Sequence, residues 1–339
     1  MEIYTIRDVA RKAGVAVSTV SRVLNGRPDV SEETRKRVLD VVEQFGFVQN
    51  RNARNLKNTK PVFAAIIVRG RRNAFLNDVA TQMIEYSQGL KTPFLIKYID
   101  EQDDEFDTMR QLYAEKRAGS FIFLGSRLDE RCEAVSAVGV PVVFATVDAA
   151  NAGLYNASSV CVDDRAATRA MMDRILAQGH TRVAVFGGNR DGEDIFAKRY
   201  QGAMDSLKAH GIAYDPDEYV HSRFSLEGGY ESAMRFFEKH RDVTAVMTMS
   251  DMMAMGVTRA LHEMGLRVPQ DVSVAGFDGT VMGRYYVPSI ASVRQPVQEI
   301  ARRSVELLCE MLEGGQAQHI KVDYSLVEGE SVGPVRTRV

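Results

Sequence analysis

The sequence has only three cysteines in 339 residues, and it contains no long apolar run. Cys132, Cys161 and Cys309 lie far apart, without a CxxC pair or cysteine and histidine at zinc-ligand spacing, so neither a disulfide framework nor a zinc site is expected. No stretch approaches the roughly 20 apolar residues that span a bilayer. Charged residues interrupt the N-terminal segment, so it lacks the continuous apolar run of a signal peptide. We therefore expect a cytoplasmic protein without membrane contact.

The common catalytic and nucleotide-binding motifs are also absent. There is no GxSxG, no GxxxxGK[ST], no HExxH, and no GxGxxG that opens a helix after a strand. The adjacent acids Asp103 and Asp104, and Asp163 and Asp164, are more typical of helix N-terminal caps than of a catalytic acid pair. The sequence therefore predicts no enzyme, no metal and no cofactor. Turnover of a sugar by the purified protein would revive the enzymatic alternative.

The small net charge of −2 conceals an asymmetry along the chain. Residues 1–60 contain 12 Lys and Arg against 7 Asp and Glu, whereas residues 61–339 contain 31 against 38. A basic segment attached to a larger acidic one indicates contact with a polyanion through the small N-terminal piece.

Apolar residues recur at helical spacing between residues 5 and 47, in three short stripes. Gly14 and Gly26 are expected to end the first two helices, and Ser31 to cap the third. Two short helices joined by a tight turn predict a helix-turn-helix, whose second helix enters the major groove of DNA. Residues 49–60 are polar and basic with one large apolar residue, Leu56, which predicts a linker or a conditional helix.

After Pro61 the pattern changes to short apolar strands that alternate with amphipathic helices. This alternation predicts parallel sheets covered by helices on both faces, in two α/β lobes with a ligand cleft at the carboxyl ends of the strands. The expected strands are residues 62–68, 94–99, 120–124, 140–145, 183–186, 245–249 and 272–277.

Several strings make the resemblance to a family specific: TIRDVARKAGVAVSTVSRVLNG and SEETRKRVLDVVEQFGF near the N-terminus, then GHTRVAVFGG, SDMMAMG, VPQDVSVAGFD and SVRQP. In this order they resemble the LacI/GalR family of bacterial transcriptional repressors over essentially the whole chain. The resemblance implies an N-terminal all-α helix-turn-helix domain with a hinge helix, followed by a two-lobed α/β periplasmic-binding-protein-like effector domain with parallel sheets.

The resemblance also implies domain boundaries and a function. The helix-turn-helix domain is expected at residues 1–48, the hinge helix or linker at 49–60, and the effector-binding and dimerisation domain at 61–339. Within the latter, lobe 1 is expected at about 61–160 plus 293–322, and lobe 2 at about 161–292 plus 323–339. The implied function is sequence-specific regulation, by repression, of carbohydrate catabolic genes, with a small sugar-like effector between the lobes.

The family's DNA contacts carry over residue by residue. The resemblance implies that Val17, Ser18 and Arg22 read bases, and Arg22 suits bidentate bonding to guanine. Thr5, Ser21 and Asn25 match positions that touch phosphates or brace the helix. Leu56 matches the lever that wedges into the minor groove at the centre of the operator. The implied partner is a pseudo-palindromic double-stranded operator, bound by a homodimer, and Ala16 departs from the usual hydroxyl cap.

The implied effector site draws on both lobes. By position it includes Arg69, Ser126, Thr146, Arg199, Phe224, Ser250, Asp251, Asp278 and Gln295. Carboxylate, guanidinium and amide groups with one aromatic face are typical of sugar recognition.

Arg69 is the departure from the family pattern that bears on the effector. With Arg127 and Arg199 it predicts unusual positive charge in the cleft, which favours a sugar acid or sugar phosphate, because guanidinium groups suit carboxylates and phosphates. On this hypothesis Asp251 and Asp278 balance Arg69 and Arg199 when the site is empty. A neutral sugar, with Arg69 paired internally, stays as the alternative. A transport binding protein, the remaining rival, would not need residues 1–60.

Overall fold

The computed structural model describes residues 6–24, 30–45, 63–192 and 194–336. The chain divides into two compact units, residues 1–60 and 61–339. Each unit has its own apolar core, and each is described below by itself.

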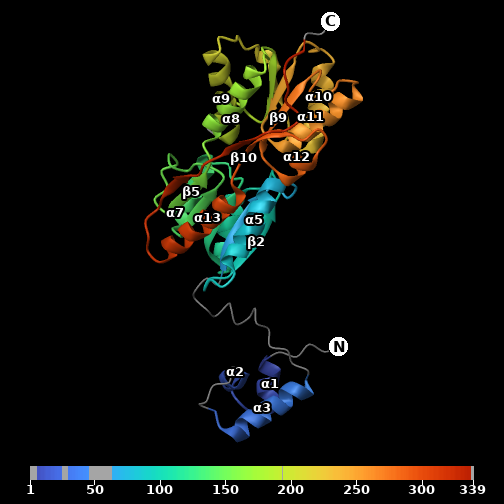
Figure 1. Ribbon diagram of the computed structural model, residues 1–339. Coiled ribbons are helices and arrows are strands. Elements are labelled where there is room, and N and C mark those ends of the chain that lie inside the picture. Colours follow the sequence, from blue (N-terminus) through green and yellow to red (C-terminus); the bar gives the residue numbers. More distant parts are fainter. Residues whose placement is uncertain (1–5, 25–29, 46–62, 193, 337–339) are drawn as a thin grey trace. The chain divides into compact units, whose positions relative to one another are not determined.

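The first unit contains three short helices (Figure 1). α1 (Ile6–Ala13) and α2 (Val17–Leu24) are joined by a turn at Gly14, whose φ of +65° lies in the left-handed region, and α3 (Glu32–Gln44) follows. Ser31 Oγ accepts a hydrogen bond from the backbone N of Thr34 at 3.4 Å, so the predicted cap is confirmed. The buried core consists of Val9, Ala10, Ala13, Val20, Val23, Val38 and Val41.

The second unit begins with lobe 1, a parallel six-stranded sheet in the order β11-β5-β4-β3-β1-β2. Its strands are β1 (Phe63–Arg69), β2 (Phe94–Ile99), β3 (Ala118–Leu124), β4 (Val142–Ala145), β5 (Ala157–Cys161) and β11 (His319–Lys321). Alternate residues of β1 enter different cores, because neighbouring side chains on a strand point to opposite faces.

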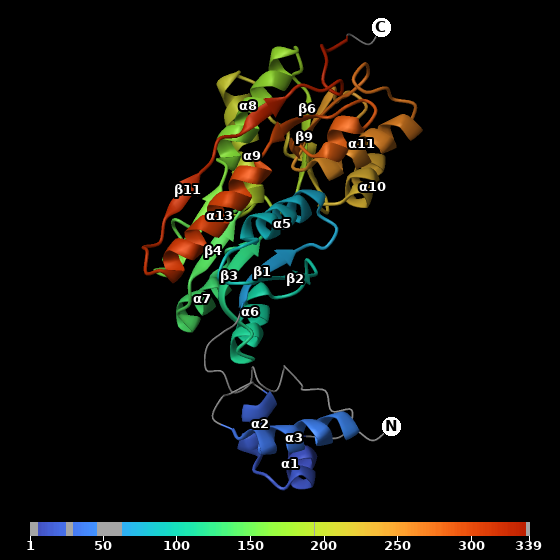
Figure 2. The same ribbon diagram turned by 60° about the horizontal axis from the view of Figure 1, so that its bottom comes forward.

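Helices cover both faces of this sheet. α5 (Ala74–Ser87) and α13 (Val297–Leu312) lie side by side on one face, as Figures 1 and 2 show. α6 (Glu105–Ala114) and α7 (Glu133–Val138), the latter preceded by the 3₁₀ turn η1 (Glu130–Cys132), pack on the other. The predicted parallel sheet with two covered faces is therefore confirmed.

Lobe 2 repeats this architecture with one difference. Its sheet has the order β12-β10-β9-β8-β6-β7, and β12 runs antiparallel to β10. Its strands are β6 (Val183–Gly187), β7 (Tyr219–His221), β8 (Ala245–Thr248), β9 (Ser273–Asp278), β10 (Ala291–Arg294) and β12 (Ser325–Val327). One face carries α8 (Asp164–Ala177) and α9 (Ile195–Ala209), and the other α10 (Leu226–Phe237) and α11 (Asp251–Glu263). The short η2 (Pro216–Glu218) and α12 (Val281–Tyr285) complete the lobe.

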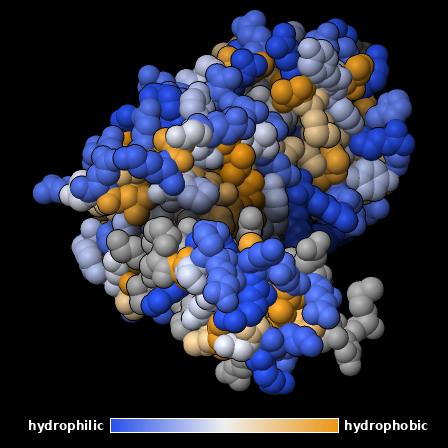
Figure 3. Space-filling model, turned by 90° about the horizontal axis from the view of Figure 1, so that it is seen from below, coloured by the Kyte–Doolittle hydropathy of each residue, from blue (hydrophilic) through white to orange (hydrophobic). Residues whose placement is uncertain are grey.

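The chain crosses between the lobes three times: from β5 to α8, from β10 to α13, and from β11 to β12. Lobe 1 is therefore assembled from both ends of the unit. The face in Figure 3 is mostly hydrophilic, with hydrophobic residues in small separate groups.

Candidate ligand cavity and DNA-binding helix

A cavity of about 420 Å³ lies between the two lobes of the second unit. Its walls come from the carboxyl ends of β1, β3 and β4 in lobe 1 and of β6, β7 and β9 in lobe 2, where α/β sheets bind ligands. Two other hollows have similar volumes, but this one brings together buried polar side chains from both lobes. Seven predicted effector residues line it: Arg69, Ser126, Thr146, Arg199, Phe224, Asp278 and Gln295.

Two residues of the lining have a positive φ, a backbone conformation that residues other than glycine rarely adopt. Thr146 follows β4 with a φ of +75°, and Asp278 ends β9 with a φ of +112°. Among the described residues other than glycine, Lys116 alone shares a positive φ with them. Such conformations cost about 1–3 kcal/mol and cluster at binding sites, so the strain in both walls points to this cavity.

In lobe 1, Arg69 is held by the side chain of Glu105 and the backbone of Glu101. Its Nη1 lies 3.4 Å from Oε2 of Glu105, and its Nε and Nη2 donate to the backbone oxygen of Glu101 at 3.1 and 2.7 Å. Glu105 also accepts hydrogen bonds from Ser126 Oγ at 2.5 Å and from the backbone N of Arg127 at 3.0 Å. Burial raises the pKa of Glu105, whereas these donors and Arg69 lower it.

In lobe 2, Arg199 is held in the same manner. Its Nε donates to Oδ1 of Asp164 at 2.8 Å, and its Nη1 donates to the backbone oxygen of Met249 at 2.5 Å. The guanidinium carbon lies 3.5 Å from the ring centroid of Phe277. Because the cation contacts a carboxylate, a carbonyl and an aromatic face, its charge is compensated inside the protein.

Asp278 is the carboxyl group of lobe 2 that faces the cavity. Gln295 Nε2 donates to its Oδ1 at 2.9 Å, and the backbone N of Gln295 donates to its carbonyl oxygen at 3.2 Å. Burial, together with the charges of Asp251 and Asp164, raises the pKa of Asp278 to about 8, although Arg199 acts in the opposite direction. At neutral pH this side chain is therefore largely a protonated carboxyl, which can both donate and accept.

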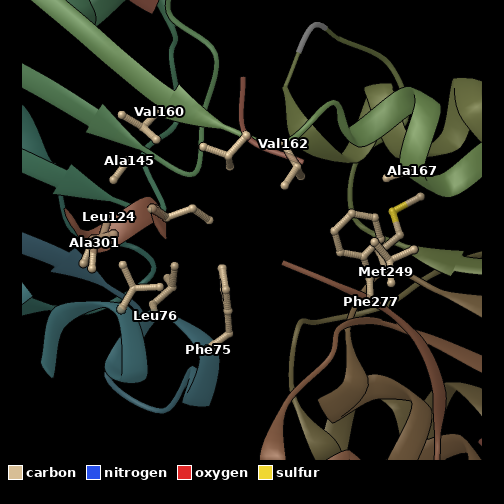
Figure 4. Packing of buried hydrophobic residues seen from close by; sticks show 14 of the residues in the cluster. Phe75, Leu76, Leu124, Ala145, Val160, Val162, Ala167, Met249, Phe277 and Ala301 are labelled. Carbon is tan, nitrogen blue, oxygen red and sulfur yellow. The ribbon is translucent and has the colours of Figure 1, made fainter. Parts of the chain in front are cut away.

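Three aromatic side chains contribute to the apolar part of the lining, beside Leu76 and Ile195. Phe75 comes from α5, Phe196 from α9 and Phe224 from the segment before α10. The rings of Phe196 and Phe224 are 4.7 Å apart between centroids. Figure 4 shows Phe75 on the lobe 1 side and Phe277 on the lobe 2 side. Polar groups with an aromatic surface are suited to a ligand that has hydroxyls and an apolar face.

Ser250 and Asp251, also expected at the effector, lie outside the lining. Ser250 caps α11 by accepting from the backbone N of Met253 at 3.2 Å. Asp251 Oδ2 accepts from N and Oγ1 of Thr280 at 2.6 and 2.9 Å, and its Oδ1 accepts from Ser292 Oγ at 2.5 Å. Burial raises the pKa of Asp251 to about 6. Both side chains therefore hold the protein's own backbone and hydroxyls.

The expected counterions of the two arginines are corrected by these contacts. Asp251 and Asp278 do not pair with Arg69; Glu105 does, and Asp164 pairs with Arg199. Asp164 was not predicted because the sequence pattern of Asp163 and Asp164 was interpreted as a helix cap, and Glu105 lies outside the two acid pairs that the sequence brought to attention. Asp104 and Asp163 are caps, but each precedes a buried acid that begins the helix. An acid doublet at a helix start, next to an α/β cleft, was the available signal.

In the first unit, α2 has the expected arrangement for a recognition helix. Val20 and Val23 are buried in the core, whereas Val17 and Arg22 are exposed. The backbone N of Val20 donates to the carbonyl oxygen of Ala16, so Ala16 is the residue before the first turn of α2. Its side chain has no oxygen that could cap the helix.

The other predicted DNA contacts have less structural description. Ser18 and Ser21 belong to α2. Thr5, Asn25, Leu56 and the predicted hinge segment 49–60 lie outside the described residues.

The described residues were also searched for metal sites and membrane spans. They contain no group of three or more His, Cys, Asp or Glu side chains placed to hold a metal ion. None of their helices is long and apolar enough to cross a membrane.

Comparison with known proteins decides the family. Residues 5–50 match the bacterial regulatory proteins of the lacI family, and residues 172–332 match the periplasmic binding protein-like domain. The transcriptional regulator MalR of Clostridium butyricum is 32% identical over 340 residues, which cover 96% of this chain and 98% of MalR. The chain belongs to the LacI family. It is a DNA-binding transcriptional regulator, as its sequence predicted.

Solved structures agree with this fold. A complex of the transcriptional regulator CelR with cellobiose has a TM-score of 0.72 and 25% identity, and the match covers 97% of this chain and 99% of CelR. The lac repressor dimer bound to operator and the anti-inducer ONPF has a TM-score of 0.70 and 23% identity, over 98% and 100% of the two chains. The predicted fold class is therefore confirmed.

Proposed function

We propose that this LacI-family protein represses carbohydrate catabolic genes by binding a pseudo-palindromic operator, under the control of a small sugar-like effector held between its two lobes. One observation carries the proposal: a chain with an exposed helix-turn-helix also has a cavity lined by strained strand ends from both lobes. The match to a regulator in complex with cellobiose supports a sugar as the ligand class.

The DNA contacts proposed for residues 1–60 follow the resemblance. Val17, Ser18 and Arg22 read bases in the major groove, while Thr5, Ser21 and Asn25 hold the backbone. The exposure of Val17 and Arg22 on the side of α2 away from its core supports this assignment. Residues 49–60 connect the two units and carry Leu56, the proposed minor-groove lever.

Operator binding is tested with Arg22→Ala. Loss of a bidentate contact to guanine should cost about 1–3 kcal/mol of binding free energy and relax base preference at one position of each half-site. Arg37→Ala, which removes an exposed arginine from α3, is the matched control. Binding of the wild type and both variants to randomised DNA sites measures the effect. Equal base preference in Arg22→Ala and wild type would contradict the proposed reading helix.

Leu56→Ala tests the hinge. It should weaken specific binding while the base preference of the outer half-sites stays unchanged, because a wedge bends the DNA without reading it. Unaltered specific affinity in the same assay would show that Leu56 is no lever.

The effector contacts proposed here are the seven predicted residues that line the cavity. A thermal-shift screen over neutral sugars, sugar acids and sugar phosphates identifies the ligand, since a ligand that binds only the folded protein raises its unfolding temperature. Arg199→Ala or Gln295→Ala should abolish that shift. A shift that survives both substitutions would place the ligand elsewhere.

We also propose that the functional form is a homodimer, and that α12 belongs to its interface. Val281, Met282, Tyr285 and Val287 are 63%, 50%, 76% and 86% exposed within seven residues of chain. Several exposed apolar side chains so close together in the chain are typical of a surface that binds another protein. A second copy is the proposed occupant because the lac repressor, which has the same fold, is a dimer in its operator complex. Tyr285→Glu should shift a dimer to a monomer in sedimentation velocity.

A further inference from the structure

Each wall of the cavity contains an arginine whose charge is balanced by a buried carboxylate of the same lobe. The side chains of Arg69 and Glu105 are 7% and 3% exposed, and those of Arg199 and Asp164 are both 4% exposed. Both carboxylates occupy the first residue of a helix, α6 and α8 respectively. The positive end of a helix dipole stabilises an ionised carboxylate at that place.

The pair in lobe 1 is part of a larger network. Nε and Nη2 of Arg69 donate to the carbonyl oxygen of Glu101, and Nη1 donates to the carboxylate of Glu105. Glu105 in turn accepts from Ser126 Oγ and from the backbone N of Arg127. Three donors converge on this carboxylate, which is the pattern of an ionised acceptor. Glu105 therefore fixes both a predicted effector residue and the loop after β3.

This network limits what charge a ligand can carry. A carboxylate or phosphate that bound Arg69 would have to share this guanidinium with Glu105, which already balances its charge, and would lie close to a carboxylate of the same sign. An uncharged hydroxyl could instead bind beside the pair, through Ser126 or the opposite wall, without separating it. In lobe 2, Asp164 has the same relation to Arg199.

We infer that Glu105 is a specificity-determining residue: by pairing with Arg69 it keeps this guanidinium from binding an anionic group, and so favours an uncharged, polyhydroxylated effector such as a neutral sugar. This inference rests on the proposed function, because it takes the cavity as the effector site. It favours the neutral alternative over the sugar acid or sugar phosphate.

The test uses the full chain and inorganic phosphate as the anionic probe. Isothermal titration at constant ionic strength compares wild type with Glu105→Gln, which keeps the length of the side chain and removes its charge. We expect no saturable phosphate binding to wild type and at least ten-fold tighter binding to Glu105→Gln. The double variant Glu105→Gln, Arg69→Gln should lose the gained site, because it also removes Arg69, the guanidinium that Glu105→Gln leaves without its carboxylate.

Asp107→Asn is the matched control. It removes one carboxylate from the exposed surface of the same helix, where Asp107 pairs with Arg110, and changes the net charge equally. If this control also bound phosphate more tightly, the tighter binding of Glu105→Gln would be explained by the change in net charge alone. That result would overturn the inference.

Three further results would also overturn it: saturable phosphate binding to wild type that Arg69→Gln abolishes, no gain in Glu105→Gln, or a gain that persists in the double variant. If Glu105→Gln does not fold alone, it is refolded with phosphate or with chloride at equal ionic strength. Recovery with phosphate only is then the expected result, and recovery with neither contradicts the role of Glu105.

Failure of this inference and failure of the proposed function are distinguishable. The phosphate experiment does not depend on which sugar binds, and operator binding is measured separately. A protein that excludes phosphate through Glu105 but binds no sugar in the screen would keep the specificity role and lose the proposed effector class.

Discussion

The two walls of the cavity are built alike but differ in the number of carboxyl groups near their arginine. In both, a capping aspartate precedes a buried carboxylate that holds an arginine, and a strand ends in a residue with positive φ. In lobe 1, Glu105 is shared among Arg69, Ser126 and the loop after β3. Lobe 2 places Asp251 and Asp278 in addition to Asp164 near one guanidinium. In lobe 1, therefore, one carboxylate is paired with the buried guanidinium, whereas lobe 2 stores protonatable groups.

The largest expected effect comes from removing the carboxylate of lobe 2. Asp164→Asn leaves Arg199 buried without its counterion and should lower the free energy of unfolding of residues 61–339 by about 3–5 kcal/mol. Asp163→Asn, one residue earlier, is the control and should change little, because asparagine also caps helices well. Urea unfolding of the three proteins measures both. Equal stability of the two variants would show that the buried pair is dispensable.

A smaller difference should separate two glycines with positive φ, Gly125 in the cavity lining and Gly279 next to the lining residue Asp278. Gly125 in lobe 1 and Gly279 in lobe 2 have φ values of +72° and +66°. A Cβ at Gly279 would lie 2.6 Å from the Cα of Arg294, whereas at Gly125 it would lie 2.6 Å from a terminal carbon of Leu76, which can move. Gly279→Ala should therefore cost about 3 kcal/mol and Gly125→Ala about 1–2 kcal/mol. Thermal unfolding of both variants gives the order, and the reverse order would contradict the rigid contact.

The stored protons of lobe 2 predict a pH dependence. The pKa of Asp278 rises from 3.8 to about 8 on folding, so between these values the folded state keeps a proton that the unfolded state loses. Stability from this group therefore falls as pH increases through that window, by at most about 1.4 kcal/mol per pH unit. Asp278→Asn should remove that slope. The difference between wild type and variant in urea midpoints from pH 5 to pH 8 isolates it, and a constant difference would contradict the stored proton.

The smallest effect concerns an exposed ion pair between the two lobes. Arg72 Nη1 of lobe 1 lies 3.9 Å from Oε1 of Glu227 of lobe 2, and both side chains are exposed. Exposed pairs contribute little, so Arg72→Ala should leave the unfolding midpoint within experimental error. Arg72→Glu should weaken binding of the effector found in the screen slightly, and the added Glu227→Arg should restore it. No recovery would show that the pair does not act in closure.

The sequence predicted those features that depend on pattern. Apolar runs predicted the positions of seven strands to within a few residues. The resemblance to the family predicted nine effector residues, and seven of these residues line one cavity. β5 was missed because Ser158 and Ser159 make it look polar. Both are buried, and they bind Met311 Sδ, His319 Nδ1 and backbone groups supplied by distant segments.

Side-chain direction explains the remaining differences at the site. Ser250 and Asp251 follow a strand that ends near the cavity, but the start of α11 turns both toward the protein's own backbone. Glu105 begins a helix whose residue spacing predicts which of its faces is buried. The spacing does not predict which side chains that face contacts. Such tertiary pairings are not contained in local spacing.

The three crossings between the lobes have a consequence for synthesis. Lobe 1 holds the first strand of the second unit, yet α13 and the edge strand β11 are translated only after nearly all of lobe 2. While the chain grows from its N-terminus, the face of the lobe 1 sheet that α13 covers stays open to solvent or to chaperones. The lobe that emerges first from the ribosome thus stays incomplete until almost the whole chain is made, and a messenger truncated after β10 would yield a regulator with an unfinished ligand wall.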